Sequence, residues 1–170
     1  LKTVIIGNGL TKTGSYAFAN CGNLQSLTIG DSVTEISTGS FESCVALQSL
    51  TIPDSVTEIG SSAFSSCTGL QSVTIPDSVT SMLYNAFYSC ERLQSVTIGN
   101  GVTDIHPSTF KDCTALKFVD TGDSVTSIGS MAFFMCGALQ TVILGTAVTT
   151  ISTSAFSNAI GNNDITVYMS

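Results

Sequence analysis

Apolar and polar positions repeat along this chain with a period of 23 residues. Phenylalanine and cysteine mark the period most clearly, because each recurs at this spacing along almost the whole chain. The Phe positions are 18, 41, 64, 87, 110, 133 and 156, and the Cys positions are 21, 44, 67, 90, 113 and 136. A period in the twenties is typical of solenoids, in which each unit forms one coil and buries its apolar side against the next coil.

Each unit contains a segment that predicts a short β-strand. In residues 71–75, Gln-Ser-Val-Thr-Ile, polar residues alternate with β-branched apolar residues, which is the pattern of a strand with one buried face. We expect such strands to stack into a parallel sheet along one wall of the solenoid, about 4.8 Å apart. The predicted strands are centred on Val4, Leu27, Leu50, Val73, Val96, Val119, Val142 and Ile165.

The rest of the unit predicts a turn, a second extended segment and a helical turn. Residues 76–78, Pro-Asp-Ser, favour a turn, because proline fixes φ and an aspartate side chain can hydrogen-bond the backbone two residues on. The apolar column that contains Ile59 indicates a short extended segment. Residues 60–67 then resemble a serine-capped helical turn, with Phe64 and Cys67 on its inner face.

The repeated motifs resemble those of a known family. The strand element L-x-x-L-x-I is similar to that of the leucine-rich repeat, and the continuation I-G-x-x-A-F-x-x-C resembles the BspA-like subclass, which occurs in treponemal and other bacterial surface antigens. The resemblance covers nearly the whole chain in about seven repeats. It implies a leucine-rich-repeat solenoid of a cell-surface or secreted protein that binds host or matrix proteins or other cells.

One departure from the common leucine-rich repeat concerns the turn after the strand. Common repeats place an asparagine or cysteine there, and its side chain hydrogen-bonds the turn backbone. In this chain the column holds Ser32, Ser55, Ser78, Gly101, Ser124 and Ala147. The turn backbone must therefore be satisfied by aspartate, serine or water. A flat or gently curved solenoid is then as consistent with the sequence as a horseshoe.

We expect one domain over residues 1–170, as a piece of a larger protein that lacks its N-terminal region. The chain starts at a repeat boundary with Leu1 and has no signal-like segment. A closing repeat is expected near residues 157–170, where Ala159 replaces cysteine, Asn162 replaces leucine and Asp164 interrupts the unit. We expect a monomer. Unless an upstream segment covers it, the first coil exposes a strand edge, so end-to-end association is the alternative.

The charge balance narrows the choice of partners. The net charge is -7 and the chain has five lysine and arginine residues, which leaves no basic patch for a nucleic acid or an anionic membrane. No apolar run reaches the length of a membrane span. We therefore expect extracellular or cell-surface protein partners, no nucleic acid and no membrane insertion of this segment.

The six cysteines are expected to be buried thiols. Cysteines on neighbouring coils are close enough for disulfides, but their Cβ vectors run parallel instead of converging. Free cysteine commonly behaves as a small apolar core residue. No two cysteines have the Cys-x-x-Cys spacing of zinc sites.

Candidate catalytic and metal-binding residues are few. His106 is the single histidine and has no base or nucleophile near it in the sequence, so we interpret it as a surface turn residue. The recurrent turn aspartates fit backbone capping better than a calcium ladder, because each turn carries one of them and no Asp-x-Asp cluster occurs. They are Asp31, Asp54, Asp77 and Asp123. We predict a non-enzymatic protein without a cofactor or metal.

The candidate binding residues are those that break the repeat. Most outward positions of the predicted sheet are serine and threonine, but Phe118, Asp120 and Ile143 replace them, and Lys117 replaces a recurrent glutamine. These residues are the favoured protein-binding surface, since exposed aromatic residues beside charges are typical of interaction hot spots.

On the opposite wall, Tyr84 and Tyr88 replace small residues and form a second candidate surface. Two alternatives to protein binding remain. The regular Ser-x-Thr array resembles ice-binding solenoids, and a purely structural spacer is consistent with repeats that are so alike.

Overall fold

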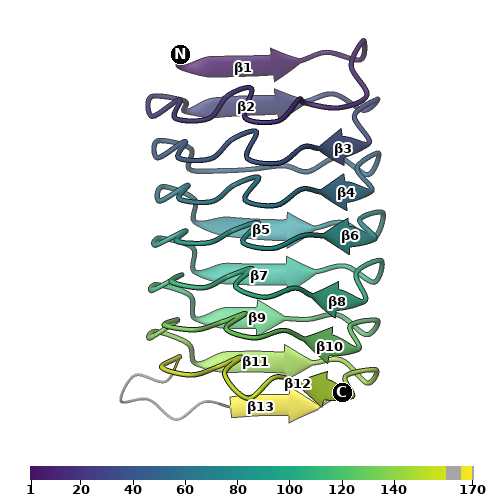
Figure 1. The fold of residues 1–170 in the computed structure, drawn as a ribbon, viewed down its shortest axis with the longest axis vertical. Helices are drawn as coiled ribbons and strands as arrows, with labels where there is room; N and C mark the ends of the chain where they lie inside the picture. Colours follow the sequence, from purple (N-terminus) through teal and green to yellow (C-terminus); the bar gives the residue numbers. More distant parts are fainter. Residues whose placement is uncertain (160–165, 170) are drawn as a thin grey trace.

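The chain folds as a parallel β-solenoid whose coils lie one below another in a nearly straight column (Figure 1). The computed structural model describes residues 1–159 and the backbone of residues 166–169. Strands of neighbouring coils pair in parallel at the repeat spacing, as where Val73 lies opposite Val96. The predicted solenoid is therefore confirmed, and each coil buries its apolar side against the coils before and after it.

The long strands lie on one side of the coils, which we call the sheet wall. In β5, Val73 and Ile75 are buried while Ser72 and Thr74 are exposed, as the alternation of apolar and polar residues predicts. The long strands are β1 (Thr3–Ile6), β2 (Ser26–Ile29), β5 (Ser72–Ile75), β7 (Ser95–Ile98), β9 (Phe118–Asp120), β11 (Thr141–Leu144) and β13 (Thr166–Met169).

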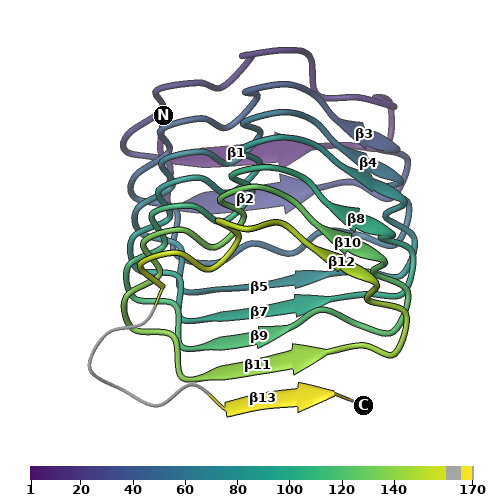
Figure 2. The ribbon, with the colours of Figure 1, turned by 60° about the horizontal axis from the view of Figure 1, so that its bottom comes forward.

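The sheet wall is interrupted at residues 49–52, which cross it without forming a strand. β1 and β2 make a two-stranded sheet, and β5, β7, β9, β11 and β13 make a five-stranded one. Figure 2 shows the two groups on either side of this coil. The strand predicted around Leu50 is therefore wrong. Leu50 is only partly buried, and leucine lacks the β-branched stem that favours strands. Leu27 of the same column nevertheless lies in β2, so the leucine side chain alone does not explain the interruption.

The last long strand pairs with a changed spacing. Thr141 of β11 lies opposite Thr166 of β13, a separation of 25 residues (166 − 141) instead of 23. The strand predicted around Ile165 is thus observed slightly later in the chain. Residue 165 itself, and the positions Asn162 and Asp164 on which the closing repeat was predicted, lie outside the described residues.

A second set of strands is short, as the apolar column of Ile59 predicts. Each has two residues, of which the second is buried in all but β12, where Ile151 is exposed, and they form two three-stranded parallel sheets. They are β3 (Glu35–Ile36), β4 (Glu58–Ile59), β6 (Ser81–Met82), β8 (Asp104–Ile105), β10 (Ser127–Ile128) and β12 (Thr150–Ile151).

The segments that close each coil form a third side, which we call the turn wall. It comprises residues 16–20, 39–43, 62–66, 85–89, 108–112, 131–135 and 154–158. The predicted helical turn is wrong, because Ser62 and Ser66 have φ values of 56° and 58° in the left-handed region. Their N–H groups donate to the carbonyls of Tyr84 (2.9 Å) and Tyr88 (2.7 Å) in the next coil. In a helix these bonds would instead close within the segment.

No helix occurs in the part of the chain that the structure describes, and accordingly none there is long and apolar enough to cross a membrane. The coils are held by hydrogen bonds between neighbouring coils in place of helical ones. On the sheet wall these bonds run in both directions, as from Gln94 N to Gln71 O of the coil before and from Thr121 N to Ile143 O of the coil after, whereas on the turn wall they point to the coil after.

The phenylalanine column forms a continuous stack beneath the turn wall. Neighbouring rings are nearly parallel, with centroids 5.4 Å apart for Phe18 and Phe41 and 5.0 Å apart for Phe133 and Phe156. This offset stacking is a favourable arrangement of aromatic rings. Phe64 lies in the middle of the stack with 0% of its surface exposed, so its predicted burial is confirmed.

The cysteines lie beside this stack as free thiols. Five of them are buried, and each donates its S–H to the carbonyl of the phenylalanine in the preceding coil at 3.2–3.4 Å. The pairs are Cys44 to Phe18, Cys67 to Phe41, Cys90 to Phe64, Cys113 to Phe87 and Cys136 to Phe110. The thiol therefore supplies a donor that an alanine could not. The predicted burial is confirmed for these five, whereas Cys21 of the first coil is partly exposed.

Burial raises the pKa of four of the thiols. It raises the pKa of the Cys44 thiol from 9.0 to about 11, and it also raises the pKa values of Cys67, Cys113 and Cys136. Because the thiolate is the reactive form of cysteine, we expect these residues to react slowly with thiol reagents in the folded chain.

Candidate functional site

Four of the predicted binding residues lie together on the sheet wall. In the pairing of β9 with β11, Phe118 lies opposite Thr141 and Asp120 lies opposite Ile143. Val119 between them is buried, so Phe118 and Asp120 share the outer face. Lys117 precedes β9 and is exposed, while Phe118, Asp120 and Ile143 are partly exposed. We call Lys117, Phe118, Asp120 and Ile143 the sheet-wall patch.

Asp120 also has a structural role that the sequence pattern did not reveal. Its Oδ1 accepts a hydrogen bond from the N–H of Gly122 at 3.0 Å. Gly122 has a φ of 67°, and a Cβ there would lie 2.4 Å from the carbonyl oxygen of Ile98, which excludes other residues. This turn is also hydrogen-bonded to the corresponding turn of the next coil, since Thr121 Oγ1 accepts a hydrogen bond from Gly145 N at 3.1 Å. Part of the departure from the repeat is therefore a local rearrangement of the turn.

The two tyrosines of the opposite surface lie in different surroundings, Tyr88 within the turn wall and Tyr84 directly before it. Tyr84 is 50% exposed, and its ring centroid lies 4.9 Å from that of His106. Tyr88 lies in one column with Lys111 and Phe134 of the next two coils. The Lys111 ammonium is 5.4 Å from the Tyr88 centroid and 5.6 Å from that of Phe134, so it lies between the rings at cation–π distance.

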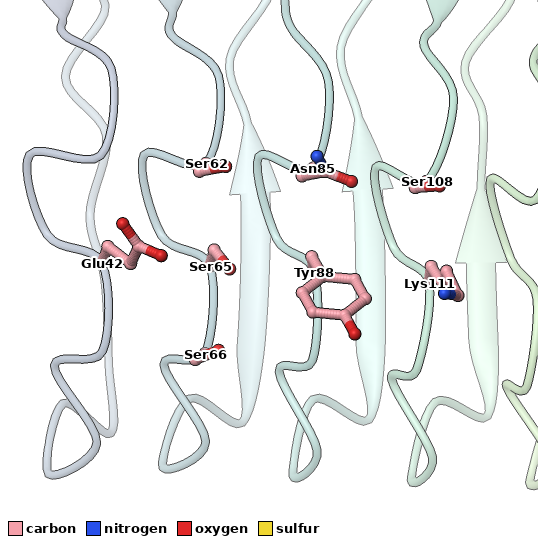
Figure 3. Close-up of a pocket in the computed structure, with 8 residues that line it drawn as sticks. All are labelled: Glu42, Ser62, Ser65, Ser66, Asn85, Tyr88, Ser108 and Lys111. Atoms are coloured by element: carbon pink, nitrogen blue, oxygen red, sulfur yellow. The ribbon is translucent and has the colours of Figure 1, made fainter.

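A shallow depression of about 390 Å³ lies on the turn wall beside Tyr88 (Figure 3). Tyr88 belongs to its lining and Tyr84 does not. Sequence reasoning missed this depression, although the column that replaces Glu42 and Ser65 by Tyr88 and Lys111 is a signal that could have located it. We call it the turn-wall depression; its lining is Glu42, Ser62, Ser65, Ser66, Asn85, Tyr88, Ser108 and Lys111.

One of the recurrent turn aspartates, Asp77, caps the backbone of the next turn. Asp77 Oδ1 accepts a hydrogen bond from the N–H of Asn100 at 2.7 Å, and Asn100 Oδ1 accepts one from the N–H of Asp123 at 2.9 Å. Ser55 contributes in another turn by donating to Val33 O at 2.8 Å. The prediction that aspartate and serine satisfy the turns is confirmed at these positions. Within the described residues, no group of three or more His, Cys, Asp or Glu side chains could hold a metal ion.

Several solved structures are similar to the chain. A leucine-rich repeat protein from Eubacterium ventriosum is 26% identical with a TM-score of 0.85, over 98% of this chain and 44% of that one. A leucine rich cell surface protein from Faecalibacterium prausnitzii is 28% identical with a TM-score of 0.68, over 100% of this chain and 60% of that one. The T. pallidum leucine rich repeat protein is 29% identical with a TM-score of 0.74, over 81% and 64%. This chain thus spans less than two thirds of the length of each.

Comparison of the sequence with curated proteins found no match. The profile of the family described as BspA type leucine rich repeat region matches in six copies, over residues 1–50 and 34–163. These matches cover most of the chain and agree with the 23-residue coils of the structure. The protein therefore belongs to the BspA-type leucine-rich-repeat family.

Proposed function

We propose that this chain is a non-enzymatic binding module of a cell-surface or secreted bacterial protein, and that its sheet wall binds an extracellular protein such as a host or matrix protein. The family and the similar cell-surface protein of F. prausnitzii support the location. The observation that carries the choice of surface is the sheet-wall patch, in which the departures from Ser and Thr lie in register on two neighbouring strands.

The chemistry of the patch suits a protein partner. Phe118 and Ile143 offer partly exposed apolar side chains, with Lys117 beside them. An aromatic residue at the centre of a patch with charge at its rim is typical of hot spots. The paired strands hold these side chains at fixed spacing, which lowers the entropy lost on binding.

The structure does not favour ice binding. A regular array of outward Ser and Thr needs uninterrupted strands, but residues 49–52 break the sheet. The Ser-x-Thr pattern is therefore carried by only two consecutive strands in register, β5 and β7. We expect no thermal hysteresis in solutions of the protein.

The test replaces the apolar members of the patch by the residues that the repeat usually carries. The double variant Phe118→Ser and Ile143→Thr leaves the Asp120 cap intact, so its melting temperature should stay that of the unchanged chain. We expect its affinity for the extracellular-matrix proteins that bind the unchanged chain, measured by biolayer interferometry on a panel of purified proteins, to fall at least about tenfold.

A matched control is Ile5→Thr, which removes an outward isoleucine that is 75% exposed at the far end of the same wall. This variant should bind normally. Unchanged affinity in the double variant would exclude the sheet-wall patch, and a parent chain that binds no member of the panel would favour the spacer interpretation.

A further inference from the structure

We propose that the turn-wall depression is a carbohydrate-binding site that takes a short, hydroxyl-rich oligosaccharide. This site lies on a different wall from the sheet-wall patch and does not depend on the protein-binding function proposed above. Three features of the depression lead to this ligand class: an aromatic ring that faces outward, side-chain polar groups that have no partner in the protein, and backbone N–H groups that are already bonded.

The aromatic ring is that of Tyr88. Figure 3 shows it in the middle of the depression with its face turned toward the viewer, between Ser65 of one neighbouring coil and Lys111 of the other. The side chain is partly exposed. The face of an aromatic ring is its negative region, so it attracts the weakly positive C–H groups that line one face of a pyranose ring. The Lys111 ammonium borders this platform, because it lies over the Tyr88 ring at 5.4 Å from the ring centroid.

The polar groups around the ring are free to bind. Within the described residues, the side chains of Ser62, Ser65, Ser66, Asn85 and Ser108 make no hydrogen bond. Ser65 is the most informative, because only 5% of its surface is exposed and its hydroxyl lines the depression without a protein partner. Its hydroxyl is open to the depression, since among the described residues the fully buried side-chain oxygens without a partner are those of Ser40 and Ser78. A ligand hydroxyl placed over Tyr88 would supply the missing partner.

The backbone of this wall argues against a peptide as the ligand. All five N–H groups of residues 62–66 already donate to carbonyls, either in their own coil or in the next one. An extended peptide usually binds by pairing its main chain with free backbone groups, and this segment has no free N–H to offer. Only side chains remain for recognition, which suits a ligand that presents hydroxyl groups.

The positions of the charged residues in the lining indicate the length and the charge of the ligand. Glu42 and Lys111 lie at opposite ends of the lining, three coils apart, which corresponds to about 14 Å at the usual spacing of strands. Lys111 is partly neutralised by Asp112, whose Oδ2 is 3.9 Å from its Nζ. The middle of the depression carries no charge. We therefore expect a short neutral oligosaccharide that lies across the coils.

The experiment begins with an array of neutral and acidic oligosaccharides probed with the unchanged chain. The best soluble binder is then titrated and followed by saturation-transfer NMR. We expect saturable binding, and we expect Tyr88→Ser to lower the affinity about tenfold because it removes the stacking platform. Serine is the residue that the preceding coil carries in this column, so this variant should fold normally.

The matched control is Tyr84→Ser, which removes an exposed tyrosine of the same coil outside the depression and should bind as the unchanged chain does. A second variant, Ser65→Ala, removes the hydroxyl that is proposed to bond the ligand and should also weaken binding. The proposal is overturned if no oligosaccharide binds above the level of an unrelated protein, if Tyr88→Ser and Ser65→Ala both bind normally, or if Tyr84→Ser loses binding to the same extent as Tyr88→Ser.

Discussion

The sheet wall and the turn wall are built on the same 23-residue period but differ in how continuously they join the coils. Residues 49–52 interrupt the sheet wall, so that its long strands fall into two separate sheets. On the turn wall, hydrogen bonds link the same coil to both neighbours, from Ser43 to Ser65 and from Ser66 to Tyr88. The stacked rings beneath the turn wall are continuous from Phe18 to Phe156.

This difference between the walls shows that a regular alternation of polar and apolar residues does not indicate how strongly a segment is bonded to the neighbouring coils. The alternation of polar and apolar residues is as clear in residues 48–52 as in residues 71–75, yet only the second segment forms a strand. The turn segments have no regular secondary structure, but the six from 16–20 to 131–135 donate hydrogen bonds to the next coil. The phenylalanines of the five segments from 39–43 to 131–135 are buried. We therefore expect the turn wall to dominate the stability of the solenoid.

The largest effect should come from the aromatic stack. Phe64→Ala should lower the free energy of unfolding by about 3–5 kcal/mol, because it opens a cavity in a close-packed core. The corresponding change on the interrupted sheet wall, Leu50→Ala, should cost roughly 2 kcal/mol or less, since Leu50 is only partly buried. Urea unfolding followed by circular dichroism measures both variants. Equal losses would contradict the ranking of the two walls.

A smaller effect should follow from the buried thiols at alkaline pH. The pKa of Cys44 is raised from 9.0 to about 11 in the folded chain, so the unfolded chain gives up this proton more readily. The contribution of the thiol to stability is present below pH 9 and is lost as the pH rises through the interval up to about 11. The urea midpoint should therefore fall between about pH 8 and about pH 10.5 more steeply in the unchanged chain than in Cys44→Ala. Parallel pH profiles of the two proteins would show that Cys44 does not contribute.

Serine-to-glycine substitutions in the two walls should have opposite effects on the stability of the chain. Ser89 has a φ of 54° on the turn wall, so Ser89→Gly should relieve left-handed strain and stabilise the chain by about 0.5–1 kcal/mol. Ser95 lies in β7, where Ser95→Gly should destabilise by a similar amount because an extended glycine loses more entropy on folding. Thermal unfolding of both variants tests the sign. The strain argument fails if Ser89→Gly is the less stable of the two.

The smallest effect should be a local one that leaves global stability unchanged. Backbone amides of residues 49–52 should exchange with deuterium faster than those of β5 and β7, because residues 49–52 have no strand partners in the described structure. Amides of residues 62–66, which belong to the same coil, should exchange slowly. Hydrogen exchange followed by mass spectrometry of overlapping peptides resolves the two segments. Uniform protection around this coil would show that the interruption has no dynamic consequence.

Much of the fold could be predicted from the sequence because the period itself carries the information. The inward columns, the parallel strands, the burial of Phe64 and the core position of the cysteines all follow from residues that recur at one spacing. The turn wall could not be derived in this way. Its left-handed positions are occupied by residues such as Ser62, Asn85 and Met131, whereas glycine is the residue from which such a conformation is usually predicted.

The candidate surfaces were predictable only as departures from the repeat. The sequence locates Phe118 and Ile143, but not the capping of Gly122 by Asp120, which depends on the course of one turn. The turn-wall depression depends on side chains from four coils and on which backbone groups are already bonded. Such properties arise from contacts between coils, so no single repeat contains them.

The direction of the hydrogen bonds has a mechanical consequence. Bonds on the sheet wall and the turn wall join one coil to the next and therefore lie along the axis of the stack. A force that pulls the two ends apart would load the bonds of one coil boundary at a time, as in a zipper. Each coil that peels off would release 23 residues, or about 75–80 Å of extended chain. A protein of this kind would yield to tension in many small equal steps, and each step would dissipate work while the remaining coils stay folded.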